Sequence, residues 1–264
     1  MIVLKNITKY FHRGSINQVL ALNNIDLRIN KGDFITIIGS NGAGKSTLLN
    51  CLAGSFFPDH GKIVLNNQDI TQWPEYKRAK FIGRVFQDPL LGTCASMSIE
   101  QNMALALRRG KPRTLSLGVK DRDRELFREQ LKKIGLGLEE RLQDKVGLLS
   151  GGQRQALTML MATMVRPELL LLDEHTAALD PKTAQQILEL TEEIVNTQHL
   201  TTLMVTHNMN QALRLGNRLI MLHRGEIILD IQGEEKQNLK VNDLLARFYD
   251  LRGEEFSSDK MLLV

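Results

Sequence analysis

The sequence has no apolar run long enough to cross a membrane. Its longest candidates, "FITIIG" (34–39) and "LLLL" (169–172), have the length of buried strands, whereas a membrane-spanning helix needs about 20 apolar residues. The first ten residues, "MIVLKNITKY", also lack the basic segment and the apolar segment of a signal peptide. We therefore expect a cytosolic protein whose role at a membrane, if it has one, depends on a partner.

Cysteine is scarce, since the 264 residues include only Cys51 and Cys94. The two lie far apart in the sequence, and neither belongs to a Cys-x-x-Cys pair. This usage is typical of free thiols in a reducing compartment. We expect both side chains to be buried or partly buried.

Charge of one sign is not in large excess either, but the net charge of +4 is unevenly distributed. Residues 108–133 contain ten Lys or Arg and four Asp or Glu, so the rest of the chain is slightly acidic. A basic segment can attract nucleic acid or an acidic membrane surface. Because charges of both signs alternate through "KDRDRELFREQLKK", a solvated helical face is the favoured interpretation.

What the sequence does contain is an alternation of strand and helix patterns. A turn signal at Asn23-Asn24 interrupts the first strand segment. From about residue 90 to 165 the chain is rich in helix formers, and Asp180 is a good N-cap for a later helix. Strand patterns recur at residues 1–30, 34–39, 169–172, 201–207 and 218–231. This order predicts a parallel α/β core with a helical lobe inserted in it.

The segment "GSNGAGKS" (39–46) matches the pattern G-x-x-x-x-G-K-[ST] between a predicted strand and a predicted helix. The glycines let consecutive backbone N–H groups point inward as an anion cradle, and the helix dipole adds positive potential. Lys45 can reach the β- and γ-phosphates, and the Ser46 hydroxyl can ligate Mg²⁺. The segment therefore predicts a site for the phosphates of a nucleotide, and we call residues 39–46 the phosphate loop.

A second candidate is "LLLLDE" (169–174), an apolar strand that stops at two carboxylates. Open α/β sheets bind ligands at the carboxyl ends of their strands. We expect Asp173 to lie on the metal side, acting through water, and Glu174 to orient or deprotonate a water that attacks the γ-phosphate. His175 follows directly, and either a structural role or a pH-sensitive influence on Glu174 remains open, with the structural role favoured.

A third candidate, "LLSGGQ" (148–153), reads as a helix N-terminus that exposes backbone donors. It has no lysine, so it is not a second complete phosphate loop. Alone it would be a weak signal, since Ser-Gly-Gly is also common in turns.

Together these segments resemble the ATP-binding-cassette (ABC) ATPases over about residues 2–232. "GSNGAGKST" resembles the Walker A loop, "LSGGQ" the family signature, "LLLLDE" Walker B and "ALD" (178–180) the D-loop. Gln87 in "VFQDP" stands where the Q-loop glutamine belongs, and His207 in "MVTHN" where the switch histidine belongs. Six motifs in family order make this resemblance highly specific.

The resemblance implies a P-loop NTPase fold of the α/β class. It consists of a RecA-like core with an N-terminal antiparallel β subdomain and an inserted α-helical lobe. We expect one ABC ATPase domain over residues 1–264. Its expected parts are a catalytic core at about 1–88 and 155–232, a helical lobe at about 89–154, and a C-terminal helical tail at 233–264.

In this family two cassettes pair head to tail, and the signature loop of one chain caps the γ-phosphate held by the other. The resemblance implies catalytic roles for Glu174, His207 and Gln87, and a Mg²⁺ ion held by Ser46, Asp173 and Gln87. An aromatic residue near the N-terminus usually stacks on the adenine, and the spacing from Lys9 favours Phe11 over Tyr10. The residues expected to contact ATP are Phe11, Gly39, Ser40, Asn41, Gly42, Ala43, Gly44, Lys45, Ser46, Thr47, Ser150, Gly151, Gly152 and Gln153.

A single cassette without fused membrane spans is typical of the detached ATPase subunit of a bacterial importer. The expected partners are a second copy or a related cassette, an integral-membrane permease that docks near residues 88–150, and a substrate-binding protein. No nucleic acid is expected, and the chain is expected at the cytoplasmic face of the membrane. Two alternatives remain: a lipoprotein-release or mechanotransmission ATPase, and a soluble cassette that acts on nucleic acid through residues 108–133.

Two departures from the family pattern indicate a particular branch. The helix "SGGQRQALTMLMATMVRPE" is rich in Met and lacks the usual Ala-Arg-Ala, and His175 replaces the usual proline. These choices are similar to cassettes of tryptophan- and tyrosine-type amino-acid import systems.

Overall fold

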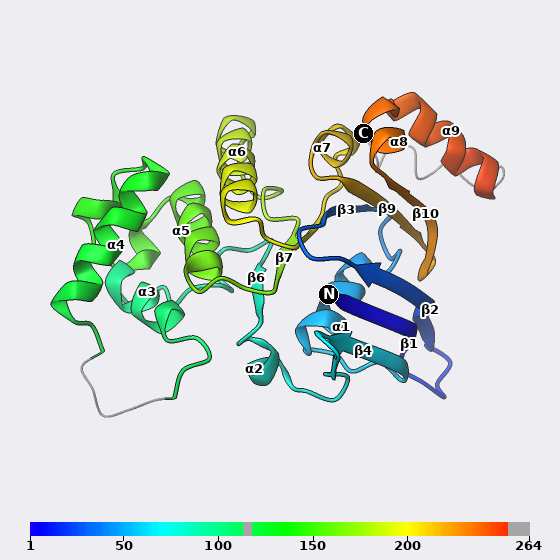
Figure 1. Cartoon of the computed structure of the whole chain (residues 1–264), viewed down its shortest axis with the longest axis horizontal. Helices are drawn as coiled ribbons and strands as arrows, with labels where there is room; N and C mark the ends of the chain where they lie inside the picture. The colour runs from blue at the N-terminus through cyan, green and yellow to red at the C-terminus, as the bar shows by residue number, and fades with distance from the viewer. Residues whose placement is uncertain (113–117, 253–264) are drawn as a thin grey trace. The chain divides into compact units, whose positions relative to one another are not determined.

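The computed structural model describes residues 1–112 and 118–252 (Figure 1). The chain forms two compact units, Met1–Arg78 with the segment from Thr201 onward, and Ala79–Leu200. The finer predicted boundaries near residues 88, 154 and 232 remain predictions. Residues 113–117 of the basic segment and 253–264 of the predicted tail lie outside the described residues. None of the described helices is long and apolar enough to cross a membrane.

The first unit contains an antiparallel sheet of order β2-β1-β4-β5. The predicted turn at Asn23-Asn24 is wrong, because β2 continues through it. Asn24 takes a left-handed φ of 51° where the pairing with β1 changes register, and asparagine tolerates this conformation better than most residues. The segment that predicted a turn therefore forms a β-bulge within strand β2. The strands are β1 (Ile2–Phe11), β2 (Val19–Ile29), β4 (His60–Leu65) and β5 (Gln68–Asp69).

The same unit contains a second sheet region in which β3 pairs in parallel with both β8 and β9. All five residues of β3 are buried, as expected for a strand covered on both faces. The predicted hairpin at Arg224-Gly225 is confirmed, since β10 returns antiparallel to β9. These strands are β3 (Phe34–Ile38), β8 (Thr202–Val205), β9 (Arg218–His223) and β10 (Glu226–Gln232). The helices are α1 (Lys45–Ala53), α2 (Glu75–Arg78), α7 (Met209–Arg214), α8 (Glu234–Asn238) and α9 (Val241–Arg252).

Helix α1 is held at its C-terminal end by a buried arginine. Gly54 closes the helix in the left-handed conformation, as predicted. The Arg78 guanidinium is fully buried and donates to the carbonyls of Cys51 and Leu52 at 2.6 and 2.9 Å. Burial lowers the pKa of Arg78 to about 10. A positive group at this end satisfies carbonyls that lack an intrahelical partner and interacts favourably with the negative end of the helix dipole. Arg78 therefore fixes the helix whose other end is the phosphate loop.

The second unit contains the parallel strand pair β6–β7, four of the described α-helices and both described 3-10 helices. Leu169 to Leu172 are completely buried, which confirms the prediction of a strand covered on both faces. The predicted helix-rich region is also confirmed. The elements are β6 (Ile82–Val85), α3 (Ile99–Leu107), α4 (Asp121–Ile134), η1 (Leu138–Glu140), η2 (Val146–Leu148), α5 (Gly151–Met164), β7 (Leu169–Asp173) and α6 (Pro181–Gln198).

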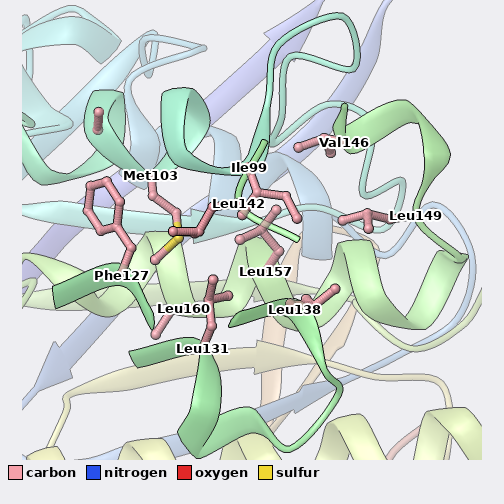
Figure 2. Packing of buried hydrophobic residues seen from close by; sticks show 11 residues of the cluster. Ile99, Met103, Phe127, Leu131, Leu138, Leu142, Val146, Leu149, Leu157 and Leu160 are labelled. Atoms are coloured by element: carbon pink, nitrogen blue, oxygen red, sulfur yellow. The ribbon is translucent and has the colours of Figure 1, made fainter. Parts of the chain in front are cut away.

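Helices α3, α4 and α5 share a hydrophobic core of their own. Figure 2 shows Met103 of α3, Phe127 and Leu131 of α4, and Leu157 of α5 pointing into it, and each is completely buried. Full burial of one such side chain contributes roughly 1.5–3 kcal/mol. This core positions the start of α5, which carries the signature segment.

The expectation for the cysteines is half right. Cys51 is buried on α1, but Cys94 is exposed. The Cys94 backbone N–H donates to the Asn102 side chain, and the Asn102 amide donates back to the Cys94 carbonyl. Since α3 ties down the backbone here, the thiol projects outward, toward Ser96.

Candidate nucleotide site

The phosphate loop joins the buried strand β3 to helix α1 and depends on two glycines. A side chain at Gly39 would place its Cβ 2.2 Å from the Leu222 carbonyl oxygen, and one at Gly44 would lie 2.5 Å from the Ala21 carbonyl oxygen. Both glycines have positive φ, 151° and 101°. The loop therefore needs glycine for space as well as for backbone conformation.

The loop presents backbone donors at the start of a helix. Among the described residues no side chain caps the N-terminus of α1, where Gly44 is the N-cap. The buried Lys45 folds back over the loop, and its Nζ donates to the carbonyls of Gly39 and Ser40 at 2.7 and 3.0 Å. A helix N-terminus with a lysine poised over it suits a polyphosphate.

A turn far away in the sequence supports the loop from behind. The Gly225 N–H donates to the Ala43 carbonyl at 3.0 Å, and the Gly225 carbonyl accepts from the Asn23 N–H at 2.8 Å. A Cβ at Gly225 would lie 2.9 Å from the Ala21 carbonyl oxygen. The sequence marked this position only as a hairpin turn, so its role as a support became visible in the structure alone.

His207 lies at the same sheet edge as the phosphate loop. Strands β3 and β8 pair in parallel up to Ile37 and Val205, and the Thr206 N–H donates to the Ile37 carbonyl at 3.1 Å. The half-buried His207 follows, and Asn208 caps α7 by accepting from the Gln211 N–H at 3.0 Å. The first unit thus brings His207 and the loop to one edge.

The two candidate adenine-stacking aromatics have different environments at the end of β1. Phe11 packs edge-on against Phe56, with ring centroids 5.3 Å apart. The Arg13 guanidinium lies over the Tyr10 ring, with the Arg13 Cζ 5.4 Å from the ring centroid. Both rings are partly exposed, and the preference for Phe11 stays a prediction.

The acidic pair ends strand β7 in the second unit, and both carboxylates are half-buried. Glu174 has a φ of 47°, in the left-handed region that residues other than glycine seldom adopt. Strain of this kind costs of order 1 kcal/mol or more and is concentrated at functional sites. Arg84 of β6 donates to Asp173, with its Nη2 3.3 Å from the carboxylate Oδ2.

Gln87 is exposed just beyond β6, at the same edge as the acidic pair. The preceding carbonyl, of Phe86, accepts from the Nε2 of Gln155 at 3.2 Å. Gln155 is fully buried on α5. The segment that carries Gln87 is therefore tied to the helix that carries the signature, a link that the sequence did not reveal.

The signature segment forms the predicted helix N-terminus. Ser150 and Gln153 make a capping box, in which each side chain accepts from the other residue's backbone N–H at 3.2 Å. The Ser150 hydroxyl still has its proton to donate to an anion. Gly152 is buried, and a Cβ there would lie 2.2 Å from the Thr183 methyl group of α6, so glycine is needed for close helix packing.

His175 is buried, with 1% of its surface exposed. Its Nε2 lies 3.0 Å from the Thr191 hydroxyl oxygen, and that hydroxyl donates to the Ile187 carbonyl at 2.7 Å. The Thr191 proton is thus committed, so Nε2 carries the proton that bridges the two side chains. Burial lowers the pKa of His175 to about 4. The structure favours the structural role, because a neutral histidine joins the end of β7 to α6.

The structural role of His175 predicts that the folded protein becomes less stable at acidic pH. Its folded pKa lies below the ordinary value of about 6.5, so the unfolded state binds more protons and the stabilisation is lost as pH falls from about 6.5 toward 4. We expect the wild type to be about 2 kcal/mol less stable toward urea at pH 5 than at pH 7.5 from this group. The variant His175→Gln should lose that part of the pH dependence.

The exposed His60 provides the matched control, since His60→Gln removes a histidine outside the core. It should retain the pH dependence of the wild type. If His175 instead tuned Glu174, then His175→Gln would change the shape of the ATPase pH profile between pH 6.5 and 8. We expect that shape to be unchanged.

The D-loop leads into helix α6 as predicted. The Asp180 side chain accepts from the Thr183 N–H at 3.1 Å, and Pro181 occupies the first helical turn. Hydrogen bonds from Thr183, through its side chain and then its backbone, lower the pKa of Asp180. Asp180 thus stays ionised at the positive end of the helix dipole.

A phosphate loop after a buried parallel strand, with an acidic strand end and a second glycine-rich helix start, defines a nucleotide-binding cassette. The ABC transporter family matches residues 22–177, more than half of the chain. The chain belongs to the ABC transporter family, and it is an ABC ATPase, an ATP-binding and ATP-hydrolysing subunit of a transporter. The predicted family and fold class are confirmed.

Several relatives are transport ATPases. The chain is 47% identical to the tyrosine transport ATP-binding protein of Clostridioides difficile, over 94% of this chain and 98% of that protein. It is 36% identical to the methionine import ATP-binding protein MetN of Escherichia coli and 34% identical to the choline transport ATP-binding protein OpuBA of Bacillus subtilis, each over 86% of this chain. It spans only 64% and 56% of the lengths of those two proteins.

Solved structures of ATP-binding cassettes are also similar to this chain. The cassette MJ0796, in a dimeric post-hydrolysis state bound to ADP and Pi, has a TM-score of 0.75 and 31% identity, over 88% of this chain and 98% of that one. The cassette MJ1267 in its ADP conformation has a TM-score of 0.76 and 27% identity, over 96% of this chain and 99% of that one. Cassettes of this family dimerise and work with membrane permeases.

Proposed function

We propose that this chain is the ATPase subunit of a bacterial amino-acid importer, and that tyrosine or a similar aromatic amino acid is its substrate. The observation that supports this is the 47% identity to the tyrosine transport ATP-binding protein over nearly the full length of both chains. The chain acts at the cytoplasmic face of the membrane, through a separate permease. A substrate-binding protein delivers the amino acid to that permease.

In the proposed mechanism the phosphate loop holds the triphosphate of ATP. The loop and helix α1 supply backbone N–H groups, and the Lys45 ammonium turns from its own loop carbonyls to the phosphate oxygens. Ser46, Asp173 and Gln87 would hold Mg²⁺, since hydroxyl, carboxylate and carboxamide oxygens are ligands that this ion accepts. Bound Mg²⁺ would neutralise negative charge on the phosphates.

Two side chains act on the reacting groups in this proposal. Glu174 accepts a proton from the attacking water, and its unusual backbone conformation sets the direction of the carboxylate. His207 donates to the γ-phosphate oxygens, and the capped turn before α7 holds it in place. Phe11 stacks on the adenine.

The cycle requires a second cassette. The Ser150 hydroxyl, with the backbone donors of Gly151 and Gly152 and the side-chain amide of Gln153, contacts the γ-phosphate held by the partner copy. The Gln155–Phe86 hydrogen bond then joins this contact to the Gln87 segment. A homodimer is the simplest arrangement, and the structurally similar cassette MJ0796 is dimeric in its post-hydrolysis state.

Transport by a reconstituted complex tests the proposal. The chain is to be co-expressed with the permease encoded beside it, purified as a complex, and assayed in proteoliposomes with radiolabelled tyrosine and ATP. We expect ATP-dependent uptake that unlabelled tyrosine abolishes and excess choline leaves unchanged. A complex that takes up choline or methionine but no aromatic amino acid would contradict the substrate assignment.

The basic segment gives little support to a function on nucleic acid. On α4, Arg124 pairs with Glu100 at 2.8 Å and with Asp121 at 2.7 Å. These pairs reduce the positive field that a polyanion would meet. ATPase stimulation by RNA or DNA that disappears with added salt would reverse this conclusion.

A further inference from the structure

Arg84 is the one charged residue of the strand β6, "IGRV", whose other three residues are buried. Strands β6 and β7 pair in parallel, with Arg84 opposite Leu171. Because side chains alternate along a strand, Arg84 and Asp173 lie on the same face of this pair. The Arg84 Nη2 is 3.3 Å from the Asp173 Oδ2, and the two side chains are only 12% and 13% exposed.

A neighbouring ring helps to hold the guanidinium. The Arg84 Cζ lies 4.5 Å from the centroid of the Phe86 ring, a cation–π distance. The Phe86 backbone is in turn held by Gln155. The arginine is therefore fixed on both sides, and its charge is less screened than that of an exposed residue.

We propose that Arg84 is a positioning residue that lowers the affinity of the nucleotide site for Mg²⁺. Its guanidinium compensates the Asp173 carboxylate before the metal arrives, and Mg²⁺ must then share that carboxylate with an existing positive charge. The inference rests on the proposed metal role of Asp173. It assigns to this chain an arginine that favours release of the metal together with the spent nucleotide.

Two opposing effects decide the sign of the expected result. Removing Arg84 loosens the orientation of one short carboxylate, which weakens metal binding slightly. It also removes a positive charge close to a site for a doubly charged ion, and this repulsion scales with the product of the charges. The charge effect is the larger one, so the variant should bind Mg²⁺ more tightly.

The test measures nucleotide binding rather than turnover. The Kd of the non-hydrolysable analogue adenylyl imidodiphosphate is determined calorimetrically in EDTA and in Mg²⁺. The ratio of the Kd in EDTA to the Kd in Mg²⁺ reports how much the metal contributes to binding. We expect Arg84→Gln to raise this ratio about tenfold over the wild type. Arg84→Lys keeps the charge and should stay within about threefold of the wild type.

Matched variants separate the possible outcomes. Arg141→Gln removes an arginine that pairs with Asp144 in the same unit and should leave the ratio unchanged. Arg84→Met serves as a second charge-removing variant, and melting curves verify folding. A ratio equal to or below that of the wild type in folded Arg84→Gln and Arg84→Met would overturn the inference.

Asp173→Asn distinguishes a failure of this inference from a failure of the proposed metal site. If Asp173→Asn lowers the ratio strongly while the Arg84 variants leave it unchanged, only the role of Arg84 is overturned. If Asp173→Asn keeps the wild-type ratio, the metal role of Asp173 and the inference that rests on it fall together.

Discussion

The Glu174→Gln variant is expected to hydrolyse ATP at least 100-fold more slowly than the wild type while binding ATP with an affinity within about twofold. A carboxamide keeps the shape of the side chain but is a poor proton acceptor. The bound ATP would therefore persist, and with it the head-to-tail dimer. Phosphate release and equilibrium ATP binding measure the two effects, and gel filtration with ATP should show a dimer in the variant.

Glu168→Gln is the matched control for this experiment. Glu168 lies one residue before strand β7 and is exposed. The same chemical change there should leave both hydrolysis and the monomer–dimer distribution as in the wild type. Turnover of Glu174→Gln at a rate near that of the wild type would remove Glu174 as the catalytic base.

The Lys45→Ala variant is expected to lose about 100-fold in affinity for ATP, or roughly 2.7 kcal/mol. The ammonium contributes charge-assisted hydrogen bonds to phosphate oxygens, and the loop supplies no other lysine. Loss of its contacts with the carbonyls of Gly39 and Ser40 would also loosen the loop. The affinities for ATP and AMP are both to be measured by calorimetry.

Comparison of the two nucleotides separates phosphate binding from collapse of the loop. The loss should be much larger for ATP than for AMP, which has no β- or γ-phosphate. Lys31→Ala, at an exposed position of the turn before β3, should change neither affinity. Equal losses for ATP and AMP would show that Lys45 supports the loop rather than the phosphates.

Much of the fold follows from local sequence signals. Buried strands are runs with few or no polar residues, as in residues 34–38, where only Thr36 is polar, and 169–172. Helix ends carry their own caps at Gly54 and Asp180. Each of these signals acts within a few residues, so the pattern alone is enough to predict it. The failure at Asn23-Asn24 has the opposite cause, because pairing with β1 carried β2 through a segment whose residues favour a turn.

The candidate site also has some features that the sequence predicts and others that only the tertiary structure shows. The phosphate loop, the acidic pair and the signature are contiguous motifs, and the sequence alone determined their residues and their order. Tertiary structure alone decided that Gly225 supports the phosphate loop, that Gln155 holds the Phe86 carbonyl and that Arg84 pairs with Asp173. In each of these pairs the partners lie 69 or more residues apart in the chain, and no local pattern contains both. His175 belongs to this second group, because only its burial against Thr191 shows that it is neutral.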